Sequence, residues 1–199
     1  LMYSSNVGTA RLIDENYSKN PEKFVEGVHR KGLATHFPLL PGTGKPVIRY
    51  PNKTNWSRTT LPWMSIGYET QIAPINIVSF YNAIANDGMM MKPYIVECTE
   101  RDGVAEKVNE PMLLNSICSK ATADTLTRAL KRVTSDGTAK VLKNARCQVA
   151  GKTGTSRMYL TPKEQRGSKN PYEDIDGRKK HQGTFVGFFP AEKPKYTAI

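Results

Sequence analysis

The motif Lys152-Thr153-Gly154-Thr155, late in the chain, constrains the fold more than any other feature. It follows the run Cys147-Gln148-Val149-Ala150, which predicts a buried strand that carries Lys152 to a cleft. A second polar motif, Ser4-Ser5-Asn6, stands near the start of the chain, just before a helix-like segment. If both motifs serve one site, the fold has to place them face to face across a single groove.

Each motif has a chemical and a plain structural interpretation. A cation and hydroxyls at a strand edge can hold an anionic substrate terminus, and Gly154 lets a substrate backbone lie close. The structural alternative is an ordinary strand end with a solvated lysine. Ser4-Ser5-Asn6 offers a hydroxyl for proton transfer and an amide for binding a peptide carbonyl. Its alternative is a helix cap, because Ser and Asn are favoured at the N-cap.

Hydrophobic periodicity and turn residues predict a mixed α/β domain with a long polar loop. The loop at 156–182 is rich in Lys and Arg, and we expect a mobile, solvated insertion, with contact to substrate or a partner as the alternative. Asn20 and Pro21 form a helix start signal, and Asn86-Asp87-Gly88 forms a stop. The expected helices are 7–17, 20–32, 74–85 and 119–134, the expected strands are 93–97, 147–155, 183–189 and 196 onward, and 37–61 is expected to be irregular.

Composition places the chain among globular proteins and narrows its partners. Of 199 residues, 38% are hydrophobic, and the 29 Lys and Arg exceed the 18 Asp and Glu, giving a net charge of +11. The basic residues are scattered, and no basic strand carries interleaved aromatics, so we expect no nucleic-acid binding. An anionic membrane surface or an acidic cell wall explains the positive charge at least as well as nucleic acid does. Three cysteines without a C-x-x-C pair and three histidines argue against a zinc site, and we expect buried thiols. No apolar run is long enough to span a bilayer, and no signal peptide is visible.

A third segment joins the two motifs into one resemblance. The region between the two motifs resembles the same region of class B penicillin-binding proteins. The resemblance covers Leu61-Pro62-Trp63-Met64-Ser65-Ile66-Gly67-Tyr68-Glu69, the helix start at Pro74 and the stretch Ala85-Asn86-Asp87-Gly88. Gly183-Thr184-Phe185-Val186-Gly187-Phe188-Phe189 is similar to a strand of the same family. The resemblance implies an α/β, penicillin-binding and serine β-lactamase-like fold, an antiparallel sheet flanked by helices. Residues 1–199 would be a partial transpeptidase domain, truncated at both ends.

The resemblance also implies a role for each motif residue. Ser4 would relay a proton to the departing D-alanine amine, Asn6 would bind the substrate's peptide carbonyl, and Lys152 would support Ser4 electrostatically. The hydroxyls of Thr153 and Thr155 would bind the terminal carboxylate, beside Gly154, and the Thr155 N–H would be one of two oxyanion donors. Glu69 stands where many relatives carry glycine.

The family's nucleophile motif, S-x-x-K, is missing, because no lysine has serine three residues before it. The implied activity is D,D-transpeptidation of D-alanyl-D-alanine stem peptides of peptidoglycan, inhibited by β-lactams and needing no cofactor. We expect this chain alone to be inactive and to self-associate. Alternatives are a D,D-carboxypeptidase or serine β-lactamase, and a non-catalytic β-lactam sensor or scaffold. The family implies a cytoplasmic-membrane protein with an outer catalytic domain and divisome or elongation partners.

Overall fold

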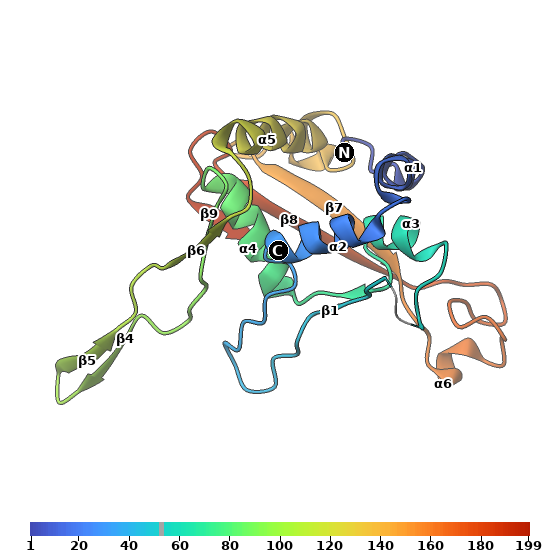
Figure 1. Cartoon of the computed structure of the whole chain (residues 1–199), viewed down its shortest axis with the longest axis horizontal. Coiled ribbons are helices and arrows are strands. Elements are labelled where there is room, and N and C mark those ends of the chain that lie inside the picture. The colour runs from blue at the N-terminus through green and yellow to red at the C-terminus, as the bar shows by residue number, and fades with distance from the viewer. Residues whose placement is uncertain (52–53) are drawn as a thin grey trace.

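The centre of the computed structural model, which describes residues 1–51 and 54–199, is a three-stranded antiparallel sheet. Its strands are β7 (Ala150–Arg157), β8 (His181–Phe189) and β9 (Tyr196–Ala198), in the order β7-β8-β9. In the register, Lys152 pairs with Val186 and Phe188 pairs with Thr197. β7 therefore forms one edge of the sheet, and the expected antiparallel sheet flanked by helices is confirmed (Figure 1).

Two helices cover one face of this sheet and close the core. They are α4 (Pro74–Ala85) and α5 (Lys120–Ser135), which begins at the expected N-cap Ser119. Side chains on a strand alternate between faces, so the paired residues Ala150 and Phe188 point to the same side. Both are fully buried, in one cluster with residues of the two helices and their neighbours: Ala83, Ile84, Met90, Ile117, Leu130 and Ala191.

On the opposite face, an aromatic ring lies across two glycines. A Cβ atom built on Gly151 would approach the ring of Phe185 to 2.4 Å, and one on Gly187 would approach it to 3.0 Å. Gly151 and Gly187 are cross-strand partners, so the ring covers a paired position of β7 and β8. Side chains at either glycine would displace this ring.

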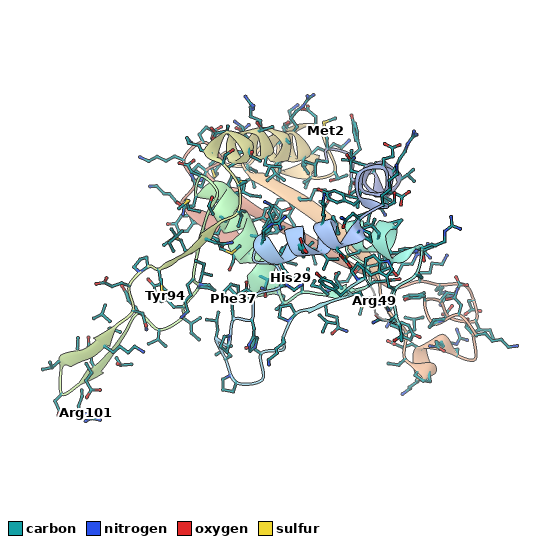
Figure 2. All side chains as sticks on the ribbon, in the orientation of Figure 1. Met2, His29, Phe37, Arg49, Tyr94 and Arg101 are labelled. Atoms are coloured by element: carbon teal, nitrogen blue, oxygen red, sulfur yellow. The ribbon has the colours of Figure 1, made fainter. Side chains whose placement is uncertain are left out.

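The three N-terminal helices pack on one another. They are α1 (Asn6–Tyr17), α2 (Pro21–Arg30) and α3 (Thr60–Ser65), and α1 contacts both α2 and α3. The Asn20 side chain caps α2, and Pro21 is its first residue, as expected. The chain start packs near α5, because the Thr138 N–H donates to the carbonyl oxygen of Met2 at 3.2 Å (Figure 2).

Three short two-stranded sheets lie outside the central sheet. β1 (Val47–Ile48) pairs with β2 (Thr70–Gln71), and β3 (Met89–Met91) pairs with β6 (Leu113–Ser116). β4 (Cys98–Arg101) and β5 (Val104–Val108) form an exposed hairpin that projects from the body, as Tyr94 and Arg101 show (Figure 2). The turn after α4 uses left-handed backbone at Asp87 and Gly88, with φ of 53° and 89°.

The predicted strand at 93–97 is wrong. Pairing with β6 ends at Met91, and ladder pairing resumes only at Cys98 in the hairpin. The apolar side chains between them remain exposed, at 44% for Tyr94 and 59% for Ile95. Their β propensity is not realised because no strand lies beside them.

Four other expectations need correction. The strand predicted to start at Cys147 begins at Ala150, and residues 147–149 are not buried. The irregular segment 37–61 contains β1 and the start of α3, with 52–53 outside the described residues. The loop at 156–182 is shorter than expected, because β7 reaches Arg157, β8 starts at 181, and α6 (Pro162–Gln165) lies between. The cysteines are not fully buried, and Cys98 is exposed.

Candidate functional site

The two polar motifs are in direct contact. The Lys152 ammonium donates a hydrogen bond to the Ser4 hydroxyl, with Nζ and Oγ 2.8 Å apart. Ser4 has left-handed backbone with φ of 52°, an uncommon conformation for a residue other than glycine. Ser5 then caps α1, and its Oγ accepts from the Gly8 N–H. The cap interpretation therefore holds for Ser5, while Ser4 turns its hydroxyl towards Lys152.

Lys152 has further acceptors on its own strand. Its Nζ lies 2.8 Å from the carbonyl oxygen of Thr153 and 3.4 Å from the Thr153 hydroxyl. The side chain is half-buried, and this burial lowers the pKa of the ammonium below its ordinary value. The Thr153 hydroxyl also lies 2.7 Å from that of Thr138, in the turn after α5. The cation thus contacts oxygen atoms of Ser4 and Thr153, and Thr138 in turn holds the Thr153 hydroxyl.

The backbone of β7 presents polar groups to the groove. The Met158 N–H donates to the Lys180 carbonyl across the ladder, whereas the Arg157 N–H points away from β8 and donates to the Tyr68 hydroxyl at 3.4 Å. Because backbone direction alternates along a strand, the N–H groups of Thr153 and Thr155 also face the free edge. At this edge, the Tyr68 hydroxyl accepts from the Arg157 N–H, and the Thr153 carbonyl accepts from the Lys152 ammonium. Within the described residues, the N–H and C=O of Thr155 remain open.

Gly154 has a packing role in this arrangement. A Cβ atom built there would lie 2.4 Å from the hydroxyl oxygen of Thr184, its cross-strand partner. The glycine therefore lets the two strands pair without displacing the Thr184 side chain. This is a structural reason for glycine, in addition to the expected close approach of a substrate backbone.

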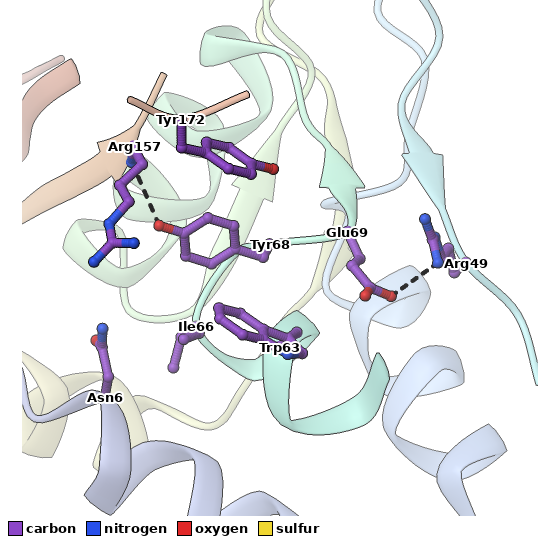
Figure 3. Close-up of a pocket in the computed structure, with 8 residues that line it drawn as sticks. All are labelled: Asn6, Arg49, Trp63, Ile66, Tyr68, Glu69, Arg157 and Tyr172. Atoms are coloured by element: carbon purple, nitrogen blue, oxygen red, sulfur yellow. Dashed lines mark hydrogen bonds and ion pairs between the residues drawn. The ribbon is translucent and has the colours of Figure 1, made fainter. Parts of the chain in front are cut away.

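A cavity of about 590 Å³ is lined by Asn6, the first residue of α1, and by Arg157 at the end of β7 (Figure 3). The rings of Trp63 and Tyr68 meet edge to face, with centroids 5.1 Å apart. Arg49 and Glu69 form an ion pair at 3.1 Å. The remaining lining residues are Ile66, Arg157 and Tyr172.

The structure brings together Ser4 and Lys152, with Thr153 and Thr155 on the same edge strand and Asn6 at the mouth of the cavity. Sequence reasoning missed Thr138, gave Tyr68 no role, and named Arg157 only as one of the basic residues of the 156–182 loop. Only Arg157 had a usable signal, since it follows Thr155 by two positions and so shares its side of the strand. The described residues contain no cluster of His, Cys, Asp and Glu that could hold a metal ion. None of the described helices is both long and apolar enough to cross a membrane.

Comparison with known proteins gives consistent matches over the whole chain. The family model described as the penicillin binding protein transpeptidase domain matches residues 1–199. PbpB, a penicillin-binding protein of Mycolicibacterium smegmatis, is 28% identical over 207 residues, covering 97% of this chain and 29% of that protein. The probable peptidoglycan D,D-transpeptidase PenA of Neisseria gonorrhoeae is 26% identical over 196 residues, covering 96% of this chain and 29% of that protein.

A solved structure agrees with these sequence matches. The D,D-transpeptidase domain of the peptidoglycan glycosyltransferase from Eggerthella lenta superposes with a TM-score of 0.73 at 25% identity, covering 97% of this chain and 45% of that one. The chain thus spans less than a third of the curated relatives described above. With the family model matched from end to end, the chain belongs to the penicillin-binding protein transpeptidase domain family, of the class B type that its motifs indicated.

Proposed function

We propose that this chain forms the substrate-binding part of a serine-type peptidoglycan D,D-transpeptidase. The observation that carries the proposal is the contact between the Ser4 hydroxyl and the Lys152 ammonium beside an open strand edge. The name of the relative PenA, a probable peptidoglycan D,D-transpeptidase, supports the same activity. The substrate would be a stem peptide ending in D-alanyl-D-alanine, and β-lactam antibiotics would occupy the same groove.

The proposed roles follow from the charges and hydrogen-bonding groups in the groove. The terminal D-alanine carboxylate would accept hydrogen bonds from the hydroxyls of Thr153 and Thr155, close to the positive charge of Lys152. The Thr155 N–H on the free edge would donate to the oxyanion that develops on the attacked carbonyl. The Asn6 amide would bind the preceding peptide carbonyl. Gly154 would keep the strand free of a side chain at this point.

Ser4 would complete the proton path. As the peptide bond breaks, the departing D-alanine nitrogen needs a proton, and the Ser4 hydroxyl can pass one on. The adjacent ammonium of Lys152 stabilises negative charge on that hydroxyl oxygen, and its lowered pKa eases proton exchange with Ser4. The amine of a second stem peptide would then resolve the acyl-enzyme and form the cross-link. The serine that carries the acyl group would come from an S-x-x-K motif, which the printed sequence lacks.

We extend the proposal to location and partners. The protein that contains this domain would be held at the cytoplasmic membrane with the domain on its outer side, where peptidoglycan is assembled. Its partners would be proteins of septal or elongation synthesis. The basic charge of the chain, +11, suits an acidic wall and anionic lipid headgroups.

A fluorescent penicillin tests the proposal. The printed chain should not be labelled, whereas a version extended upstream through an S-x-x-K segment should be. In that longer version, Lys152→Met should slow labelling by roughly 100-fold, the lower end of what proton-transfer groups contribute. Lys143→Met, at an exposed lysine outside the groove, is the matched control and should label normally. Equal labelling of the two variants would contradict the proposed role of Lys152.

A further inference from the structure

The turn that follows α5 contacts both segments that carry the motifs of the site. The Thr138 hydroxyl lies 2.7 Å from the hydroxyl of Thr153, and the Thr138 N–H donates to the carbonyl oxygen of Met2 at 3.2 Å. Thr153 belongs to β7, and Met2 precedes Ser4 by two residues. A single residue outside both motifs therefore joins the strand that carries one motif to the segment that carries the other.

The turn is itself anchored on both sides of Thr138. At the end of α5, the hydroxyl of the buried Thr134 donates to the Val149 carbonyl oxygen at 2.6 Å, just before β7 begins. After the turn, the Ala139 N–H donates to the Val133 carbonyl oxygen at 3.0 Å, and both of these residues are buried. Thr138 thus stands between fixed neighbours, and it can hold its two partners in place.

The backbone contact of Thr138 acts on the segment that carries Ser4. The Ser4 N–H donates to the Leu1 carbonyl oxygen at 3.1 Å, so Met2 and Ser4 lie in one tight turn. A Cβ atom built on Gly137 would lie 2.4 Å from the Met2 carbonyl oxygen and 2.9 Å from the Cα of Val133, which is inside α5. A larger residue at 137 would therefore displace Met2, and Ser4 would move with it.

The side-chain contact bears on where the Thr153 hydroxyl directs its hydrogen. A hydroxyl has one hydrogen to donate and two lone pairs that accept, whereas the Lys152 ammonium, 3.4 Å from this oxygen, can only donate. A carboxylate can only accept, so Thr153 has to give its hydrogen to a bound carboxylate and accept from Thr138. The Thr138 hydroxyl is able to donate, because it forms no other hydrogen bond within residues 1–51 and 54–199.

We propose that Thr138 is a positioning residue for the reaction, which directs the Thr153 hydrogen at the terminal carboxylate of the substrate and keeps Ser4 beside Lys152. The inference rests on the proposed function, from which it takes the position of the carboxylate. Thr138 acts through Thr153 and Ser4 without touching the substrate. Its hydroxyl donates to Thr153, and this bond strengthens Thr153 as a donor, because hydrogen bonds in a chain polarise one another.

Two peptides and one substitution test the side-chain role. The peptides are N-acetyl-D-alanyl-D-alanine and the same peptide with a terminal carboxamide, each titrated into the isotope-labelled 199-residue chain and followed by NMR. Thr138→Val keeps the size of the side chain and the backbone contact with Met2 but removes the hydroxyl. We expect it to bind the carboxylate peptide roughly five-fold more weakly, as for the loss of one hydrogen bond open to solvent. Binding of the carboxamide peptide should change by less than about two-fold, because a carboxamide both donates and accepts and so bonds Thr153 in either direction.

Matched variants separate this role from a general loss of packing. Thr138→Ser keeps the hydroxyl and should bind both peptides as the unchanged chain does. Thr125→Val removes a hydroxyl from α5 that donates to the Ala121 carbonyl oxygen, away from the two motifs, and should also bind normally. Circular dichroism confirms the folding of each variant.

Amide signals in the same NMR spectra test the backbone role. Gly137→Ala should shift the signal of Ser4, because Met2 is displaced, and should weaken the binding of both peptides. Thr138→Val should leave the Ser4 signal in place and shift that of Thr153 instead. If Gly137→Ala does not fold, the peptide comparison with Thr138→Val decides alone.

The outcomes separate this inference from the proposed function. The positioning role is overturned if Thr138→Val binds the carboxylate peptide as tightly as the unchanged chain, if it weakens both peptides equally, or if a folded Gly137→Ala leaves the Ser4 signal unshifted. In these cases the proposed function stands if binding of the carboxylate peptide requires Lys152, measured with Lys152→Met. If the unchanged chain does not bind this peptide, or if Lys152→Met binds it normally, the proposed function fails and the positioning role fails with it.

Discussion

The left-handed backbone at Ser4 allows a sharp test of the Ser4–Lys152 contact. Ser4→Ala removes a hydrogen bond between a hydroxyl and an ammonium 2.8 Å away but keeps a side chain at a φ of 52°. Because Ser4 is exposed, water can take over part of the bond, and we expect a loss of about 1 kcal/mol in the free energy of unfolding. Ser4→Gly loses the same bond but relieves about 1 kcal/mol of left-handed strain. The glycine variant should therefore be about as stable as the original chain.

Urea unfolding followed by circular dichroism measures both variants. Repeating Ser4→Ala in a Lys152→Met background closes a double-mutant cycle, in which we expect a coupling free energy of about 1 kcal/mol. Ser18→Ala, at the exposed end of α1, should show no coupling with Lys152→Met. The reasoning is refuted if the alanine and glycine variants are equally stable, or if Ser4 and Lys152 substitutions are additive.

Three further predictions concern titration, packing and assembly. Burial lowers the folded-state pKa of Lys152, so the unfolded chain binds more protons than the folded chain between that pKa and the ordinary value of 10.5. The free energy of unfolding should therefore rise with pH across this window. Urea unfolding at a series of pH values measures the rise, and Lys152→Met should flatten it. Phe188→Ala, at a fully buried core position, should cost about 3–5 kcal/mol in urea unfolding; a loss below 1 kcal/mol would contradict the packing described above. β9 forms an open edge of the sheet in the described part of the chain and carries Tyr196 at 64% exposure, so sedimentation should show concentration-dependent association, and a strictly monomeric profile would count against it.

Local signals predicted the helices well. Asn20 with Pro21, Ser119, and the Asn86-Asp87-Gly88 stop all act within a few residues of the elements they delimit. Such signals do not depend on the rest of the fold, so a single sequence is enough to read them.

Strands were predicted less well because their formation depends on a partner. Residues 94–96 have high β propensity but lie between two separate ladders. The weakly apolar residues of the 98–108 hairpin do pair, because the left-handed turn at Asp102 and Gly103 brings the two segments together. Propensity alone ranks these two segments in the wrong order.

The site shows the same division between local and long-range information. The two motifs, joined by the segment 61–69 into a family resemblance, led to the prediction that Ser4 and Lys152 face each other. The contact of Arg157 with Tyr68, and that of Thr153 with Thr138, join segments that no short motif connects. The cavity beside Asn6 is built from five such segments, so it appears only when the chain is folded.

The ring of Phe185 over Gly151 and Gly187 limits how this strand can evolve. Gly154 is similarly confined by Thr184, and Ala150 is fully enclosed in the core. Inherited variation is therefore expected to spare these positions. It should accumulate instead on the surrounding helices and loops, where a new side chain can reshape the groove without parting the strands.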